Sequence, residues 1–172
     1  MEIQSVETIV KVLNDNVVQY LIVGGLAVNA HGYQRLTDDV DLVIGLAPEN
    51  ITRGLHELQS IGYLMAIPVT PEAFANAELR EHWRAEKGML VLKMWSDLHR
   101  RTVIDVFVYE PFDFVREFAL ASKREVLPGV SAPVVRLDTL LQMKRTAGRP
   151  QDLADIASLE ELRQLSDNQG ND

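Results

Sequence analysis

Three aspartates inside two apolar strands constrain this chain more than any other feature of its sequence. Asp39 and Asp41 open the hydrophobic run that ends at Ile44, and Asp105 interrupts the apolar segment 103–108. Residues two apart in a strand point to the same face, so Asp39 and Asp41 share one side. Carboxylates in such surroundings are costly without compensation, and a divalent cation with hard oxygen ligands is the usual remedy. We expect a three-carboxylate site for one or two Mg²⁺ or Mn²⁺ ions.

Each aspartate also has a purely structural explanation. An Asp-x-Asp pair is common at exposed edge strands and at caps, and Asp105 could be a buried acid paired with an arginine such as Arg35. The two strands taken together favour the metal site, because each of them separately carries acid in an apolar environment.

Composition restricts the class of protein. The chain has 172 residues, which suits one domain with a buried core, and no cysteine, which excludes disulfides, cysteine-ligated zinc and a thiol nucleophile. Lys and Arg number 17 against 25 Asp and Glu, and the formal charge of −8 disfavours extended contact with nucleic acid. The first residues lack a basic region followed by an apolar run, and no apolar stretch is long enough to cross a bilayer. We expect a cytoplasmic protein without a membrane partner.

Periodicity and turn residues predict an α+β fold, a mixed β-sheet flanked by helices with a short helical C-terminal part. Ser5 is the expected cap of a first helix, and Thr70 and Pro71 open one charged helix that reaches Glu86. The expected strands are 20–23, 40–44, 89–95, 102–109 and a hairpin within 125–136, and the other expected helices are 26–30, 48–60, 111–120, 138–147 and 150–165. We expect a core over residues 1–136, C-terminal helices over 137–165 packed on it, and a disordered tail over 166–172.

A glycine pair separates the first expected strand from the helix that follows. Gly24 and Gly25 permit close backbone approach, and the free N–H groups at a helix start can bind an anion. The turn is a candidate phosphate cradle, although many strand–helix turns need glycine for steric reasons alone. It matches neither a Walker A loop nor a dinucleotide-binding fingerprint.

These motifs together resemble the nucleotidyltransferase superfamily, which has the DNA polymerase β-like fold. Val23-Gly24-Gly25 is followed after thirteen residues by Asp39-Val40-Asp41, and Asp105 lies on a later strand. The tail of the first motif, Arg35-x-Thr37-x-Asp39-x-Asp41, is most similar to the small bacterial subfamily that includes the AbiEii-type toxins. The segment from Met143 to Ile156 resembles that subfamily's C-terminal Lys…Arg…Asp stretch.

The resemblance implies a role for each matched residue. Asp39, Asp41 and Asp105 would be catalytic and hold the metal, while Gly24 and Gly25 would contact the triphosphate. Arg35 and Thr37 would line the pocket, Lys144 would bind the β- and γ-phosphates, and Asp152 would be a base or a second-shell acid. Many relatives have serine where this chain has Gly25, so backbone N–H groups would do more of the phosphate binding here.

The implied activity is Mg²⁺-dependent transfer of a nucleoside monophosphate from an NTP to an acceptor hydroxyl, with release of pyrophosphate. The acceptor could be a tRNA end, a protein hydroxyl or a small molecule, and a toxin-type enzyme could have an antitoxin protein as partner. One alternative is a non-catalytic relative that binds NTP or a partner protein. A metal-dependent phosphohydrolase is a third, disfavoured because its usual histidine ligands are absent.

Overall fold

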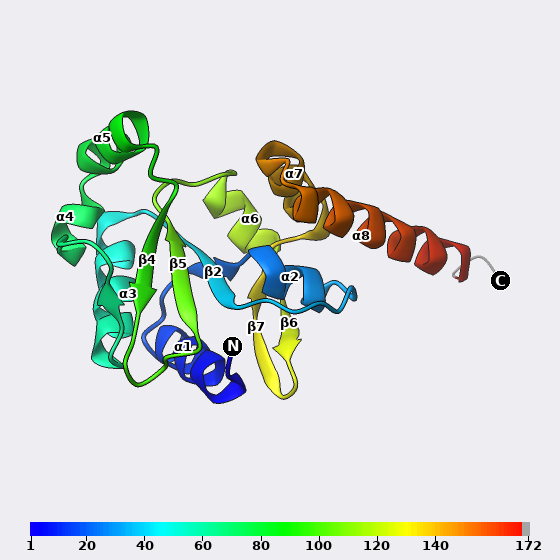
Figure 1. The fold of residues 1–172 in the computed structure, drawn as a ribbon, viewed down its shortest axis with the longest axis horizontal. Coiled ribbons are helices and arrows are strands. Elements are labelled where there is room, and N and C mark those ends of the chain that lie inside the picture. The colour runs from blue at the N-terminus through cyan, green and yellow to red at the C-terminus, as the bar shows by residue number, and fades with distance from the viewer. Residues whose placement is uncertain (170–172) are drawn as a thin grey trace.

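A seven-stranded mixed sheet forms the centre of the molecule (Figure 1). The computed structural model describes residues 1–169. The strands follow the order β3-β4-β5-β2-β1-β7-β6. Pairs β2–β5 and β1–β7 are parallel and the others antiparallel. The strands are β1 (Tyr20–Ile22), β2 (Asp39–Ile44), β3 (Leu64–Met65), β4 (Val91–Trp95), β5 (Val103–Phe107), β6 (Ser122–Leu127) and β7 (Val130–Val134). The α+β fold with a mixed sheet flanked by helices is confirmed.

Eight helices accompany the sheet within the described residues. They are α1 (Ile3–Asp15), α2 (Gly24–Ala30), α3 (Pro48–Ser60), α4 (Pro71–Ala75), α5 (Ala77–Lys87), α6 (Phe114–Leu120), α7 (Leu137–Ala147) and α8 (Pro150–Gln169). Helices α7 and α8 form a pair at one end of the molecule, and α8 extends away from the sheet (Figure 1). None of the helices formed by residues 1–169 combines the length and the apolar character needed to cross a membrane.

One face of the central strands is buried and the other is open. Alternate residues of β4 and β5, such as Leu92, Met94, Ile104 and Val106, are fully buried in the hydrophobic core. The residues between them are partly or fully exposed. A strand with this alternation buries its apolar side and leaves the other side available for a polar site.

Several local features differ from the predictions. The first helix begins at Ile3, and Ser5 lies buried inside its first turn rather than capping it. The charged helix is two helices, because Asn76 interrupts it and its side chain accepts a hydrogen bond from the Leu79 N–H, capping α5. The two-residue strand β3 was not predicted, since two residues carry no periodic signal. Helix α8 continues to Gln169, so residues 166–169 are not a disordered tail, and the remaining predicted tail, 170–172, lies outside the described residues.

Candidate active site

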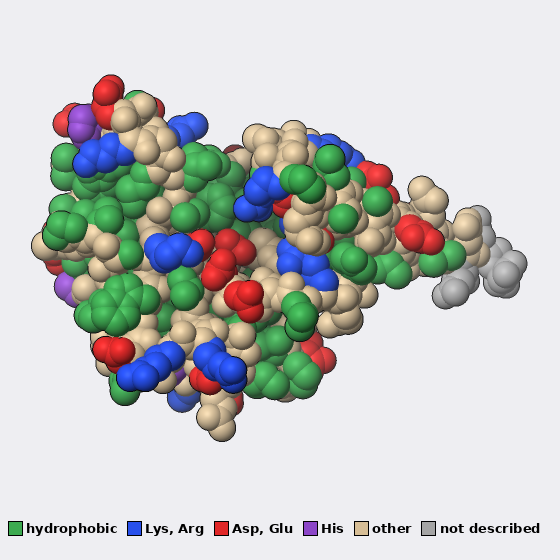
Figure 2. All heavy atoms as spheres, in the orientation of Figure 1, with side chains coloured by type: hydrophobic (Ala, Val, Ile, Leu, Met, Phe, Trp, Pro, Cys, Tyr) green, Lys and Arg blue, Asp and Glu red, His purple; other side chains and the backbone are tan. Residues whose placement is uncertain are grey.

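The parallel pairing of β2 with β5 brings the predicted carboxylates to one face of the sheet. Asp41 lies directly across from Asp105, and Asp39 lies across from Val103. Asp39, Asp41 and Asp105 are all partly exposed on the open face. Figure 2 shows acidic side chains gathered over β2 and β5, with basic side chains on either side. The pairing of β2 with β5 therefore brings Asp41 and Asp105 side by side on this face.

The three carboxylates do not close around a common point as they stand. Within residues 1–169, no three His, Cys, Asp or Glu side chains lie close enough together to hold an ion. Instead, Lys93 of β4 lies opposite Asp105, with its Nζ 3.0 Å from Oδ1. Mutual repulsion between the carboxylates, together with this attraction toward Lys93, accounts for the open arrangement.

The pKa values of Asp41 and Asp105 are raised first by burial and further by neighbouring acids. Burial raises the pKa of Asp41 to about 6, and the charges of Asp105 and Asp39 contribute to the rise, while a hydrogen bond from the Gly25 backbone and the charge of Arg149 oppose it. Burial also raises the pKa of Asp105, and the hydrogen bond from Lys93 opposes that rise. Negative charge is therefore under-compensated at this face of the sheet.

The donor chemistry of the three aspartates suits a hard divalent cation, although their spacing as they stand does not close around one. All three candidate ligands are carboxylates, the donor type that Mg²⁺ and Mn²⁺ prefer. The Oδ1 atom of Asp105 is buried and accepts no hydrogen bond of good geometry, and its one positive neighbour is the Lys93 ammonium at 3.0 Å. Asp39, Asp41 and Asp105 would together hold such an ion.

The two glycines allow Asp41 and Thr37 to pack against the start of α2. Gly24 has a φ of +60°, and a Cβ there would overlap Oδ2 of Asp41. A Cβ on Gly25 would overlap Oγ1 of Thr37 and would lie 3.2 Å from Nη1 of Arg35. Glycine is thus required for both backbone conformation and close approach at Gly24, and for close approach at Gly25. The predicted group of Gly24, Gly25, Arg35 and Thr37 is brought together beside Asp41.

A Gly24→Ala substitution should be more destabilising than an equivalent substitution elsewhere. Gly88 has the same φ of +60° but no atom within 4 Å of a Cβ, which makes Gly88→Ala a matched control. The left-handed conformation alone costs alanine about 1–2 kcal/mol, and the overlap with Asp41 adds about 1–3 kcal/mol. Urea unfolding of both variants measures the difference. Equal losses of stability would show that Asp41 does not pack against Gly24 as described.

Arg35 is held in place by a buried acid on α8. Its Nε and Nη2 lie 2.8 and 2.9 Å from the two oxygens of Asp155, and its Nη1 donates to the Leu36 carbonyl. The partner of Arg35 is therefore Asp155, and the alternative pairing of Arg35 with Asp105 is not seen. This ion pair ties the loop before β2 to the C-terminal helix, so α8 positions a basic group beside Gly25.

Lys144 and Asp152 belong to the same buried network. The Nζ of Lys144 lies 3.1 Å from Asp152 Oδ1 and 2.7 Å from Asp155 Oδ2, and its side chain is only 5% exposed. Arg149 also binds Asp152, with its Nε 2.7 Å from Oδ2. An ammonium bound to two carboxylates is poorly placed for direct phosphate contact. In this structure Lys144 anchors Asp152 and Asp155, and the phosphate-binding role that the resemblance implies stays a prediction.

The network also depresses the pKa values of both acids. Burial by itself would raise the pKa of Asp155, but hydrogen bonds from Arg35, Lys144 and Gln151 hold it below the usual range. In the same way, Arg149 and Lys144 outweigh burial and lower the pKa of Asp152. Asp152 is accordingly a weak base, and in this structure it holds Lys144 and Arg149.

Sequence reasoning missed Lys93 and Asp155. Both left a signal. Lys93 is the one charged residue in the strand Val91–Trp95, the same anomaly that singled out Asp105. Asp155 follows Asp152 by one helical turn, so both project from the same side of α8.

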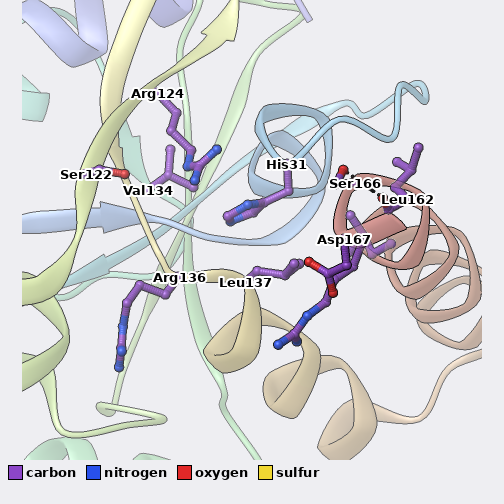
Figure 3. Close-up of a pocket in the computed structure, with 11 residues that line it drawn as sticks. His31, Ser122, Arg124, Val134, Arg136, Leu137, Leu162, Ser166 and Asp167 are labelled. Atoms are coloured by element: carbon purple, nitrogen blue, oxygen red, sulfur yellow. Dashed lines mark hydrogen bonds between the residues drawn. The ribbon is translucent and has the colours of Figure 1, made fainter. Parts of the chain in front are cut away.

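A hollow lies beside His31, the residue that follows the last turn of α2 (Figure 3). His31 projects into this cavity of about 270 Å³, and its Nε2 lies 2.8 Å from the Val135 carbonyl oxygen. Burial lowers the pKa of His31, and the charge of Arg124 lowers it further. Two arginines on the cavity wall are already committed, Arg136 to Glu117 and Arg163 to Asp138. None of the predicted site residues lines this cavity.

Comparison with known proteins supports the fold assignment. No protein-family profile matches the sequence, and no curated protein matches it. Among solved structures, a lincosamide antibiotic adenylyltransferase, LnuA, with lincomycin bound has a similar fold, with a TM-score of 0.62 and 15% identity over 93% of this chain and 97% of that chain. An antigenic nucleotidyltransferase-like protein from Paracoccidioides brasiliensis gives a TM-score of 0.55 and 17% identity over 94% of this chain and 76% of that one. The chain has the nucleotidyltransferase fold.

Proposed function

We propose that this protein transfers a nucleoside monophosphate from an NTP to an acceptor hydroxyl and releases pyrophosphate. The observation that carries the proposal is the position of Asp41 opposite Asp105, on the open face of a nucleotidyltransferase-type sheet and beside the Gly24-Gly25 turn. The two similar structures, an adenylyltransferase and a nucleotidyltransferase-like protein, agree with this chemistry. We extend the proposal to the AbiEii-like subfamily on the motifs around Thr37 and Lys144.

One group of residues is proposed to bind the triphosphate and another the metal ion. The glycines at 24 and 25 let the triphosphate approach the backbone closely, and Arg35 faces the same corner with the N–H groups that Asp155 and Leu36 do not use. Thr37 lines the same corner. Lys144, Asp152 and Asp155 hold Arg35 and Arg149 in position. A Mg²⁺ or Mn²⁺ ion on Asp39, Asp41 and Asp105 would supply Lewis-acid polarisation of the α-phosphate and activation of the acceptor hydroxyl.

The acceptor has room beside Asp39. An open basin of about 440 Å³ is lined there by Met1, Asp38, Asp39, Arg100, Arg101 and Val103. We place the acceptor hydroxyl in this basin, since the reacting phosphorus must lie between the leaving pyrophosphate and the attacking oxygen. A tRNA end, a protein hydroxyl and a small molecule are all candidate acceptors, and one similar structure, that of LnuA, has a small molecule, lincomycin, bound. If the enzyme is of the toxin type, we propose that an antitoxin protein binds it.

The proposal is tested by label transfer. Purified protein is incubated with each α-labelled NTP and Mg²⁺ in separate reactions that contain total RNA, a protein extract or a panel of hydroxylated small molecules. We expect labelled acceptor and an equal amount of pyrophosphate, and we expect Asp39→Ala to lose both while its circular dichroism spectrum is unchanged. Equal behaviour of the two proteins would contradict the proposal, and free inorganic phosphate as the product would indicate a phosphohydrolase.

A second candidate function is NTP binding without turnover. The observation that favours it is the open arrangement of the three carboxylates, which do not converge on one ion as they stand. Nucleotide binding by equilibrium dialysis without any labelled acceptor, in wild type and Asp39→Ala alike, would support this regulatory alternative.

A further inference from the structure

Strand pairing places Lys93 beside the carboxylate group formed by Asp39, Asp41 and Asp105. β4 is paired on both sides, with β5 at Lys93↔Asp105 and with β3 at Met94↔Met65, so the register that places Lys93 is fixed. Its backbone carbonyl also accepts a hydrogen bond from the Ala66 N–H, at 2.9 Å. The Lys93 side chain cannot leave the open face without disrupting these pairings.

The ammonium of Lys93 contacts the acid that most needs a positive partner. Its Nζ lies 3.0 Å from Asp105 Oδ1 and 3.4 Å from Oδ2, and the Asp105 side chain is 14% exposed. In the described part of the chain, Lys93 is the one basic side chain in ion-pair contact with Asp39, Asp41 or Asp105. Arg35 and Arg149 lie nearby but are bound to Asp155 and Asp152.

Charge counting shows what this fixed cation does to the site. Asp39, Asp41 and Asp105 carry three negative charges when ionised, and Lys93 supplies one positive charge within ion-pair distance. One divalent cation then brings the group to neutrality. A second divalent cation would make the group strongly positive and would have to approach the Lys93 ammonium, which is costly at short range.

We propose that Lys93 takes the place of a second divalent cation, so that the carboxylate group binds a single Mg²⁺ or Mn²⁺ ion per chain. Lys93 is a positioning and charge-balancing residue on this view. The inference rests on the proposed function only where it concerns catalysis. The number of ions bound can be measured on a protein that turns over no substrate.

The test counts Mn²⁺ bound by the intact protein. Free Mn²⁺ is followed by electron paramagnetic resonance during titration of wild type, Lys93→Met, Lys93→Arg and Lys123→Met. Lys123 is exposed on β6 and makes no ion pair in the described structure, so Lys123→Met matches the change in net charge without touching the carboxylates. Circular dichroism and thermal unfolding verify that each variant is folded.

We expect one Mn²⁺ per chain for wild type, Lys93→Arg and Lys123→Met. We expect two for Lys93→Met, with the second ion bound about tenfold or more tightly than in wild type. Two ions already present in wild type, or a Lys93→Met titration identical to wild type, would overturn the inference while leaving label transfer untouched. No Mn²⁺ binding by any variant would also overturn it. Conversely, one ion in wild type and two in Lys93→Met without label transfer would refute the proposed function alone.

Discussion

Asp41→Asn should abolish nucleotidyl transfer and, at the same time, make the metal-free protein more stable at pH 8. Transfer is expected to fall by at least about a hundredfold, because Asp41 is a proposed metal ligand at the centre of the group. The gain in stability has a separate cause. Burial and the neighbouring acids Asp105 and Asp39 raise the pKa of Asp41 from 3.8 to about 6, so its ionised form is disfavoured in the folded chain.

The pH dependence of this stability follows from the direction of the shift. Below about pH 4, Asp41 is protonated in both the folded and the unfolded chain and costs nothing. Between about pH 4 and 6 the folded chain holds the proton more tightly, so the free energy of unfolding falls as the pH rises. The full shift corresponds to about 3 kcal/mol, and partial solvent exposure of Asp41 reduces the expected effect to about 1–2 kcal/mol. Asparagine does not ionise, so the variant should lose this decline.

Urea unfolding in the presence of EDTA, at pH 4 and pH 8, measures the effect. Asp38→Asn is the matched control, since Asp38 is exposed, adjacent in sequence and identical in charge. We expect Asp38→Asn to follow wild type at both pH values. Mn²⁺ should raise the unfolding temperature of wild type and of Asp38→Asn but not of Asp41→Asn. A variant less stable than wild type at pH 8 would contradict the under-compensated charge described for this site.

The sequence predicted those parts of the site that local patterns encode. The spacing of Asp39 and Asp41 places two carboxylates on one side of a strand, and the apolar run around Asp105 reveals a second costly acid. The pairing of β2 with β5 brings them together, and that long-range contact is contained in no local pattern. The glycine turn was identified because glycine permits unusual backbone conformations. That glycine at position 24 also makes room for the Asp41 side chain became visible only in the three-dimensional structure.

The role of Lys144 was the part that sequence could not decide. A lysine on a helix can extend into solvent, reach a ligand or fold back onto a neighbouring acid, and all three choices share one helical pattern. The choice here depends on how α8 packs against α7, which brings Asp152 and Asp155 within 3.1 and 2.7 Å of the ammonium. A buried charge is stable only when it is paired, so Lys144 binds the two acids that also hold Arg35 and Arg149.

Asp155→Ala should be the most destabilising single substitution in the C-terminal helices. Asp155 is fully buried and binds Arg35 through both oxygens and Lys144 through one. Its removal leaves the Arg35 guanidinium without its carboxylate partner and Lys144 with Asp152 alone. Breaking a buried pair by deleting one partner costs about 3–5 kcal/mol, because the remaining charge stays desolvated. Since hydrogen bonding holds the pKa of Asp155 below its usual range, the contribution is present near neutral pH and is lost as the pH falls through that lowered pKa.

Glu160→Ala supplies the matched control for this substitution. Glu160 lies on the same helix and pairs with Arg145 of α7, but both side chains are about half exposed, so its loss should cost no more than about 1 kcal/mol. Urea unfolding at pH 7 measures both variants, and the gap between them should close as the pH is lowered. Binding of an NTP by equilibrium dialysis adds a second readout: Asp155→Ala should weaken it by releasing Arg35 from its place beside Gly25, whereas Glu160→Ala should leave it unchanged. Comparable stability and NTP affinity in the two variants would mean that the buried network neither holds α8 in place nor positions Arg35, and the proposed division of roles at the triphosphate corner would have to be abandoned.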